Sequence, residues 1–445
     1  MATVVIQGLA PRTERIRSMP QLVLGWVLVI PLVFFVVHGT PSFESTANQT
    51  ANAGPLSGLV SNGRNSGFIG SVLIPGVAYS IVMWLLLTNA RRIFQIALQM
   101  KLLTLLATLT ICSAAWSQDP FRSAYNGGFY LIETLFAYYL VAKLDSSEIR
   151  SLIMMAGLVT AVVGLAMVFL TPQFSVLHSA RDGISWTGLF TDRTSTGKAM
   201  VFFLSPALVF VGKEFRYRRM AYILLLAFLA FMAHAATARV ILVLYIAFMA
   251  AISLYTRFGR RSSVIIAAVF ALLGAAIICA GFLVLPQLLN ALGRNATLSG
   301  RTVIWGLVLQ SIAKRPLLGY GFYAFWQGFK GESARIILGA NWVFGYAHNG
   351  ILEIWLQVGL VGVALFFVTL LQACRDAWSC LRRGCPPGVQ WYIGIIALTV
   401  LYNVDESTVL WPIDLLSVLY LVACTGLAMT ARRIRQIDAI EAMYK

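Results

Sequence analysis

Long apolar runs recur from one end of this 445-residue chain to the other. Roughly 20 mostly apolar residues are needed for a helix to cross a bilayer, and runs of about that length alternate here with short polar or basic segments. Hydrophobic residues make up 59% of the sequence and charged residues only 11%, which excludes an ordinary soluble domain. The pattern therefore predicts an all-α polytopic membrane protein.

Measured against that length, the chain contains about twelve predicted transmembrane helices. About nine of them form an N-terminal transmembrane bundle in residues 1–285. A large outer loop with short helices is expected in residues 286–347, and the last transmembrane helices and a tail occupy residues 348–445. The predicted crossings lie near residues 21–38, 68–89, 102–117, 125–142, 151–170, 197–212, 221–237, 240–256, 263–285, 350–371, 389–404 and 407–427.

Basic residues set the expected orientation. Most of the 34 Lys and Arg residues fall in one alternate set of connecting segments, from the segment around Arg15 to the segment around Arg433. The positive-inside rule makes this set cytoplasmic, so both termini are expected in the cytoplasm and the loop 286–347 on the outer side. The first crossing is expected to stay as an anchor, because no suitable small-residue cleavage site follows it closely.

The outer loop 286–347 is basic, with six Lys and Arg residues and a single acidic residue, Glu332. Positive charge on the outer face opposes the topological bias, so we expect an anionic partner there. Lipid headgroups are one candidate. Phosphates of a bound substrate are the other, because arginine offers a planar donor fork that suits phosphate oxygens.

Further basic residues occupy outer positions near predicted crossings. Arg301 opens a predicted short helix that ends at Pro316, and Arg193 and Lys198 lie at the mouth of a crossing. Arg239 interrupts an apolar run, and a charge at the bilayer centre is costly, so we expect it at a tight outer turn. These side chains either converge on one outer cavity or act separately as interfacial anchors.

His348 directly follows the outer loop and opens the next apolar run. Imidazole is suited to proton transfer near neutral pH, and the positive end of a helix dipole favours its neutral form. Two interpretations are open at this point. The residue is either a catalytic base or a histidine that anchors the helix in the membrane interface.

Cysteines and carboxylates give no sign of a metal site. The six cysteines lie in apolar runs or in a basic turn, and Cys380 and Cys385 form only a weak zinc-like pair. We therefore expect no disulfide framework, no metal and no cofactor. The outer carboxylates show no D-x-D spacing, and they are Glu44, Asp119, Asp182, Asp192, Glu332, Asp405 and Glu406.

Several short motifs follow one another in a fixed order along the middle of the chain. Together they resemble the O-antigen ligase and polymerase superfamily of bacterial envelope glycosyltransferases, and most closely its O-antigen ligase branch. A weaker echo follows from Asn403 to Ser407. The motifs are Ser113-Ala114-Ala115-Trp116-Ser117 with Asp119-Pro120, Arg239, Ser299-Gly300-Arg301 with Trp305, Pro316-Leu317-Leu318-Gly319-Tyr320-Gly321, and His348-Asn349 with Gly359 and Gly362.

The resemblance implies a GT-C-like fold and an inverting, metal-independent transfer of O-antigen polysaccharide. The donor would be undecaprenyl diphosphate-linked polysaccharide, and the acceptor a sugar hydroxyl of the lipid A core. The family's functional histidine corresponds to His348, the general base, and its two functional arginines to Arg301 and Arg239. The match around Arg239 is looser, because Val243 stands where the family often has leucine.

The resemblance also implies a place and partners. The enzyme would be a multi-pass protein of a Gram-negative inner membrane, with a periplasmic active site and membrane lipids around it. We expect Arg193, Lys198, Asn349 and Tyr320 to bind substrate, and we expect no nucleic-acid partner.

Other functions stay open. An O-antigen polymerase or a protein O-oligosaccharyltransferase would use the same donor and the same residues. A transporter or flippase would use charged residues within the spans as ion sites, and Glu133, Glu353 and Asp414 are the candidates. Glu353 lies about one helical turn beyond Asn349, so we expect it to support hydrogen bonding near the site instead.

Overall fold

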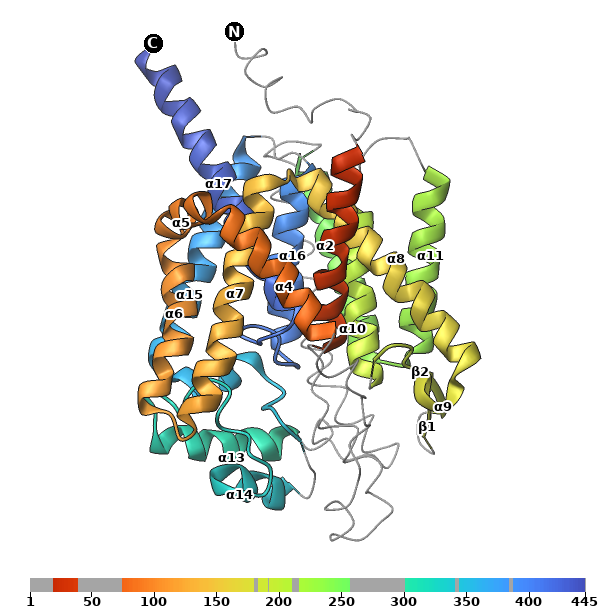
Figure 1. The fold of residues 1–445 in the computed structure, drawn as a ribbon, viewed down its shortest axis with the longest axis vertical. Helices are drawn as coiled ribbons and strands as arrows, with labels where there is room; N and C mark the ends of the chain where they lie inside the picture. The colour runs from red at the N-terminus through yellow and green to blue at the C-terminus, as the bar shows by residue number, and fades with distance from the viewer. Residues whose placement is uncertain are drawn as a thin grey trace.

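Helices account for most of the computed structural model (Figure 1). A short antiparallel hairpin, in which β1 (Val176–Ser179) pairs with β2 (Gly183–Trp186), departs from the all-α expectation. The structure describes residues 19–38, 74–179, 183–190, 192–209, 216–256, 301–340, 344–383 and 387–444. The predicted crossing at 263–285 lies outside these residues.

The helices begin at polar caps and end at breaks in the apolar pattern. Asp119, Asp145, Asp192, Asn349 and Asp414 each cap a helix by accepting backbone N–H groups of its first turn. The helices that precede the outer loop are α2 (Met19–His38), α4 (Ile74–Thr88), α5 (Ala90–Gln99), α6 (Lys101–Cys112), η3 (Ser113–Trp116), α7 (Pro120–Lys143), α8 (Ser146–Leu170), α9 (Pro172–Ser175), α10 (Arg193–Leu204), η4 (Ser205–Leu208), α11 (Arg216–Met232) and an unlabelled helix, Ala236–Thr256.

The second part of the chain carries the outer loop and the last long helices. The expected short helix at Arg301 is present as α13 (Arg301–Lys314), and it ends before Pro316 as expected. A second short helix, α14 (Gly331–Ala340), packs against it. Three longer helices follow, namely α15 (Gly350–Arg382), α16 (Pro387–Asn403) and α17 (Leu415–Met443).

Four helices in the described part of the chain are long and apolar enough to cross a membrane. They are α8, Ala236–Thr256, α15 and α17, and the bent pair Pro75–Thr88 and Ala90–Gln99 would make a fifth. Shorter apolar helices occupy other predicted crossings, at Gly25–Val37, Lys101–Trp116 and Gly388–Asn403. The protein is thus a multi-pass, mainly helical membrane protein, and the number twelve stays a prediction.

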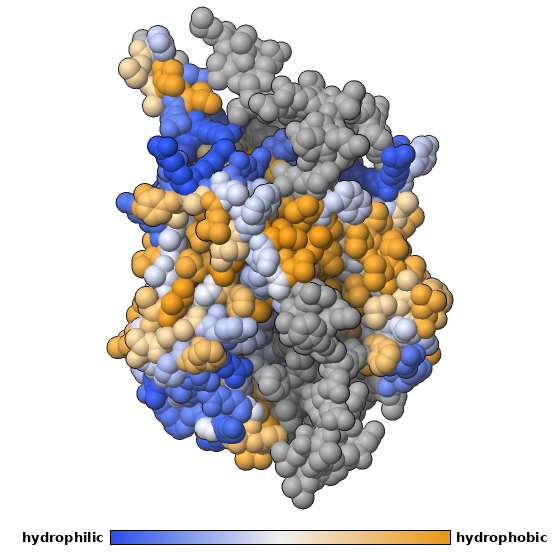
Figure 2. Space-filling view, viewed as in Figure 1, coloured by the Kyte–Doolittle hydropathy of each residue, from blue (hydrophilic) through white to orange (hydrophobic). Residues whose placement is uncertain are grey.

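The surface of the molecule agrees with a membrane environment. Figure 2 shows a broad hydrophobic band around the middle of the visible face, with hydrophilic surface above and below it. Helices α13 and α14 lie together at one end of the bundle, and α5 and the C-terminal part of α17 lie at the other (Figure 1). The basic residues Arg91, Arg432 and Arg433 therefore lie at the end opposite to α13 and α14.

Helix α15 is broken at Gly359, where the backbone has a φ of +69° that glycine adopts at little cost. The segment Pro316–Gly321 lies in this break. Its last two N–H groups donate to the carbonyls of Leu356 and Gln357 at 2.8 and 2.9 Å, and the carbonyl of Pro316 accepts from the N–H of Leu360 at 2.9 Å. Non-helical backbone within an apolar helix is tolerated where protein groups satisfy it in this way. The outer loop is thereby joined to the helix that follows His348.

Candidate functional site

His348 lies in the loop just before α15, next to the capping residue Asn349. Its side chain is about 2% exposed, and its backbone takes a positive φ of 49°. A positive φ is uncommon in residues other than glycine, although histidine adopts it more often than most, and here the buried surroundings hold the residue in place. The histidine is therefore fixed within the protein, and the interpretation as an anchor exposed to the membrane interface does not describe its surroundings.

The residue before it, Ala347, is held from both sides. Its N–H donates to the carboxylate of Glu353 at 2.7 Å, and its carbonyl accepts from the indole of Trp305 at 3.0 Å. The same Glu353 carboxylate accepts from the indole of Trp326 and from the amide of Gln357. The expectation that Glu353 supports local hydrogen bonding is confirmed, and these contacts fix the position of His348.

A buried carboxylate, Glu406, faces the imidazole from the segment between α16 and α17. Its Oε2 atom lies 3.9 Å from Nδ1 of His348 and accepts from the hydroxyl of Tyr346 at 3.0 Å. Burial opposes ionisation of Glu406, but the hydrogen bond and charge of His348, with the charges of Lys198 and Arg301, lower the pKa of its carboxyl to about 2. The carboxylate is thus ionised at neutral pH, beside the histidine.

Arg301 reaches the same segment from the first turn of α13. One terminal nitrogen of its guanidinium contacts Asp405, and the other donates to Oε1 of Glu406 at 3.3 Å. The second oxygen of Asp405 accepts from the hydroxyl of Thr237 at 2.6 Å. The outer loop, the start of the helix Ala236–Thr256 and the segment after α16 therefore meet at one cluster of charges.

Lys198 extends this cluster from α10. Its side chain is buried, and its charge acts on Glu406 and on Asp414, whose pKa is nonetheless raised to about 7 by burial. Together with Arg301, this lysine gives the cluster a second cation. A small pocket opens beside it, lined by Thr194, Ser195, Lys198, Tyr346, Glu406, Ser407 and Trp411.

The cluster combines three chemical capacities. An imidazole next to a carboxylate can accept a proton, because the carboxylate stabilises the imidazolium that forms. Two cations nearby can bind an anionic group and stabilise charge that develops on it. The arrangement therefore suits deprotonation of a hydroxyl beside an anionic leaving group.

The other residues expected at the site lie in different settings. Arg239 is not in the turn between its two helices, which is formed by residues 233–235, but in the first turn of Ala236–Thr256. It is exposed there, and its guanidinium lies 5.9 Å from the ring centre of Phe231. Arg193 is the first residue of α10 and is half-buried. Both remain substrate-binding or catalytic proposals.

Tyr320 and Asn349 have structural contacts. The hydroxyl of Tyr320 donates to the carbonyl of Ser311 at 2.8 Å, and its ring packs in the small core beneath α13. The side chain of Asn349 accepts from the N–H groups of Ile351 and Leu352, which caps α15. Substrate contacts of these two residues stay predictions.

Asp405 and Glu406 were expected only as outer carboxylates within the weaker echo from Asn403 to Ser407, with no role in the site, and Tyr346 was not expected there. Two adjacent carboxylates directly between two predicted crossings were the available signal, because an ionisable group close to the hydrocarbon region is costly unless it has a partner. The sequence gives no indication, however, that this segment lies against His348.

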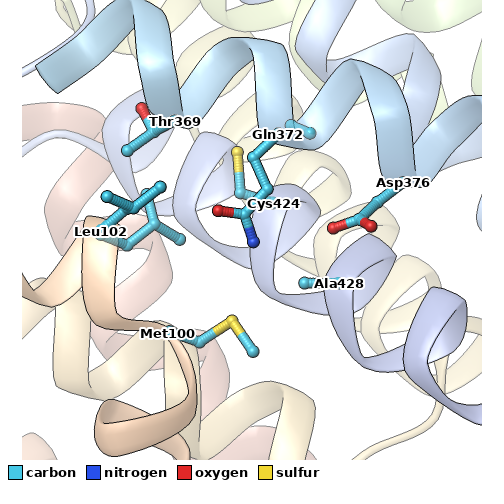
Figure 3. A pocket seen from close by; sticks show the side chains of 9 residues that line it. Met100, Leu102, Thr369, Gln372, Asp376, Cys424 and Ala428 are labelled. Carbon is cyan, nitrogen blue, oxygen red and sulfur yellow. The ribbon is translucent and has the colours of Figure 1, made fainter.

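Side chains that could coordinate a metal ion are sparse at this site. Among the residues that the structure describes, no group of three or more His, Cys, Asp or Glu side chains is placed to hold a metal ion. A separate pocket lies between α6, α15 and α17, at the end opposite to α13, and is lined by Asp376 and Cys424 among others (Figure 3). Its buried carboxylate, Asp376, is paired with Arg435 at 3.1 Å, so this pocket is not part of the charge cluster around His348.

Residues 221–367 match the family described as O-antigen ligase. The chain is 29% identical over 152 residues to the exopolysaccharide production protein ExoQ of Rhizobium meliloti (strain 1021), which covers 33% of this chain and 34% of that protein. It is 31% identical over 96 residues to a putative polysaccharide ligase of Rickettsia prowazekii (strain Madrid E), which covers 20% of this chain and 24% of that protein. The matched region contains Arg239, Arg301 and His348 and ends before Glu406.

Proposed function

We propose that this chain transfers O-antigen polysaccharide from undecaprenyl diphosphate to a sugar hydroxyl of the lipid A core. The premise is that the chain carries an O-antigen ligase domain and belongs to that superfamily. The family match and the two relatives support a function of the polysaccharide ligase type, with a polysaccharide as substrate. The reaction would take place at the periplasmic face of a Gram-negative inner membrane. The chain matches 34% of the length of one of these relatives and 24% of the other.

The contact of His348 with Glu406, and of Glu406 with Arg301, is the observation that carries the proposal. His348 would accept the proton of the acceptor hydroxyl as its oxygen attacks the anomeric carbon of the donor sugar. The bond from that carbon to the diphosphate oxygen breaks as the new glycosidic bond forms, with inversion at the carbon. Arg301 and Lys198 would stabilise the charge that develops on the departing diphosphate.

Arg239 has a different place in the proposal. It is exposed at the start of the helix Ala236–Thr256, two residues beyond Thr237, which is bonded to Asp405. From there it would hold the part of the diphosphate that lies nearest the membrane surface. Arg193, at the start of α10 and next to the pocket-lining Thr194, would act in the same way.

An acceptor-choice experiment tests the function. The purified protein, in lipid nanodiscs, is given undecaprenyl diphosphate-linked O-antigen with lipid A core, with a second lipid-linked glycan, or with an acceptor protein. We expect polysaccharide to appear on the lipid A core, and His348→Ala to remove that product. Failure of every acceptor with the native protein would overturn the proposal.

A polymerase is the second candidate, because the longer of the two matches is to an exopolysaccharide production protein. The same base and cations would then join two lipid-linked glycans. A product that lengthens only in the presence of the second lipid-linked glycan would select this function over the ligase.

A further inference from the structure

Arg301 is engaged on both terminal nitrogens of its guanidinium. Nη1 contacts Asp405, and Nη2 lies 3.3 Å from Oε1 of Glu406. The arginine side chain is only 19% exposed, so few of its donors face solvent. An anionic ligand that binds the guanidinium must therefore share or replace one of these carboxylates.

The terminal nitrogens are the groups that a phosphate would use. An arginine binds a phosphate most strongly through two parallel N–H donors at one edge of its fork. Both carboxylates carry the same sign of charge as a diphosphate, and they occupy these donors. They compete with the ligand by direct contact and repel it through a partly buried, low-dielectric region.

The two carboxylates differ in how firmly they are held. Glu406 is 4% exposed and is bound on its other oxygen by Tyr346, with His348 nearby. Asp405 is 30% exposed and has Thr237 as its other partner. Asp405 is therefore the carboxylate that can turn toward solvent when Arg301 leaves it.

We propose, resting on the proposed function, that donor binding exchanges the carboxylates on Arg301 for the donor diphosphate, and that Asp405 is the internal competitor that this exchange displaces. Glu406 keeps its contacts with Tyr346 and His348 but loses the neutralising effect of Arg301. Its negative charge then acts mainly on the imidazole that receives the proton of the acceptor hydroxyl during the reaction. The base thus becomes effective only when the donor is in place.

If this exchange occurs, a substitution of Asp405 in the site should strengthen the binding of undecaprenyl diphosphate. Asp405→Asn keeps the size and the contact with Thr237 but removes the competing charge. Native protein and variants are placed in nanodiscs of phosphatidylethanolamine and phosphatidylglycerol, and the Kd of radiolabelled undecaprenyl diphosphate is measured. We expect Asp405→Asn to bind about tenfold more tightly than the native protein, in the range that a single charge contact supplies.

Matched variants separate the exchange from general electrostatics. Glu332→Gln removes a negative charge from the outer loop that contacts Lys314 and Arg335 and has no contact with Arg301, so it should leave the Kd unchanged. In an Arg301→Ala background, Asp405→Asn should no longer change the Kd, because the guanidinium for which Asp405 and the diphosphate compete is absent. Asp405→Ala is a second variant that removes the competing charge. The rise in the unfolding temperature of each variant on addition of undecaprenyl diphosphate is a second measurement of binding.

The outcomes are distinct. If Asp405→Asn and Asp405→Ala bind undecaprenyl diphosphate more weakly than the native protein or equally well, the carboxylate only positions Arg301. That result would overturn the exchange and leave the proposed function intact. Equal tightening by Glu332→Gln would also overturn it. Failure of the native protein to bind undecaprenyl diphosphate would overturn the proposed donor and the exchange together.

Discussion

Nδ1 of His348 lies 3.9 Å from Oε2 of Glu406, although 57 residues separate the two along the chain. The histidine precedes α15, and the glutamate follows α16. The antiparallel course of these two helices brings both side chains to one end of the bundle, where the outer loop covers them. An ionised carboxylate at this position stabilises a protonated imidazole, which is what a general base becomes during the reaction.

The first prediction concerns Glu353, whose carboxylate accepts a hydrogen bond from the backbone N–H of Ala347 next to His348. Glu353→Gln replaces one acceptor oxygen by an amide that would face the N–H groups of Ala347 and Trp326. An unsatisfied buried donor costs roughly 1–3 kcal/mol. We expect kcat to fall at least about tenfold while the KM for the donor changes little, because the base is misplaced and the cations are not.

The measurement is steady-state transfer by inserted protein, with Glu332→Gln as the matched change on an exposed ion pair. A pure rise in KM for the donor in Glu353→Gln would contradict the positioning role.

Arg301→Lys tests whether a fork or only a charge is needed. Lysine keeps the positive charge but cannot contact two oxygens in parallel. We expect it to be nearly as damaging as Arg301→Ala in turnover and in undecaprenyl diphosphate binding. Lys314→Ala removes a cation that is 52% exposed and paired with Glu332, and it should have little effect. Equal losses at both positions would indicate diffuse attraction of anions.

Much of the helical fold can be predicted from the sequence. Apolar runs and polar breaks indicate α8, α15 and α17, and the short helix at Arg301 follows from the breaks on either side of it. The hairpin β1–β2 could not be predicted, because its strands are four residues long and lack a clear alternation of apolar residues.

The site was predictable only in part. The structure brings His348, Arg301 and Lys198 to one cluster, and convergence on one outer cavity was one of two alternatives that the sequence left open. The motif from Pro316 to Gly321 has an architectural role, since it fills the break at Gly359. The role of Asp405 and Glu406 was missed because it depends on a contact between segments far apart in the sequence, and local pattern contains no information on such contacts.

Removal of metal ions gives a further prediction. Two cationic side chains, Arg301 and Lys198, act on Glu406 beside the proposed base, and a guanidinium can neutralise a diphosphate oxygen directly. We expect transfer to continue at an unchanged rate in EDTA, and added Mg²⁺ or Mn²⁺ not to raise it. A rate that collapses in EDTA and returns with one of these ions would contradict the proposal.

Acid should weaken the cluster around Glu406. The pKa of this carboxyl is lowered from 4.5 to about 2 in the folded protein, so the stability that it contributes is complete above pH 4.5 and is lost as the pH falls from 4.5 toward 2. Thermal unfolding of detergent-solubilised protein between pH 7 and pH 3 measures this loss. Glu406→Gln should flatten the curve below pH 4.5, and an unchanged slope would contradict the assigned ion pairs.

Asp414 provides a contrast in the opposite direction. Burial raises its pKa from 3.8 to about 7, so the stability linked to its protonated form is lost as the pH rises through 7. Asp414→Asn should therefore remove the fall in stability between pH 3.8 and pH 7 and leave the curve outside that range as it is in the native protein.

The most direct test of the central claim is transfer of lipid-linked polysaccharide by His348→Ala, compared with His178→Ala, which removes an exposed histidine on β1. Both variants are checked for insertion and for undecaprenyl diphosphate binding. We predict a loss of at least about 10²-fold for His348→Ala with donor binding retained, because a general base typically contributes 10²–10⁴ in rate, and native transfer for His178→Ala. Native turnover by a correctly inserted His348→Ala protein would contradict the account.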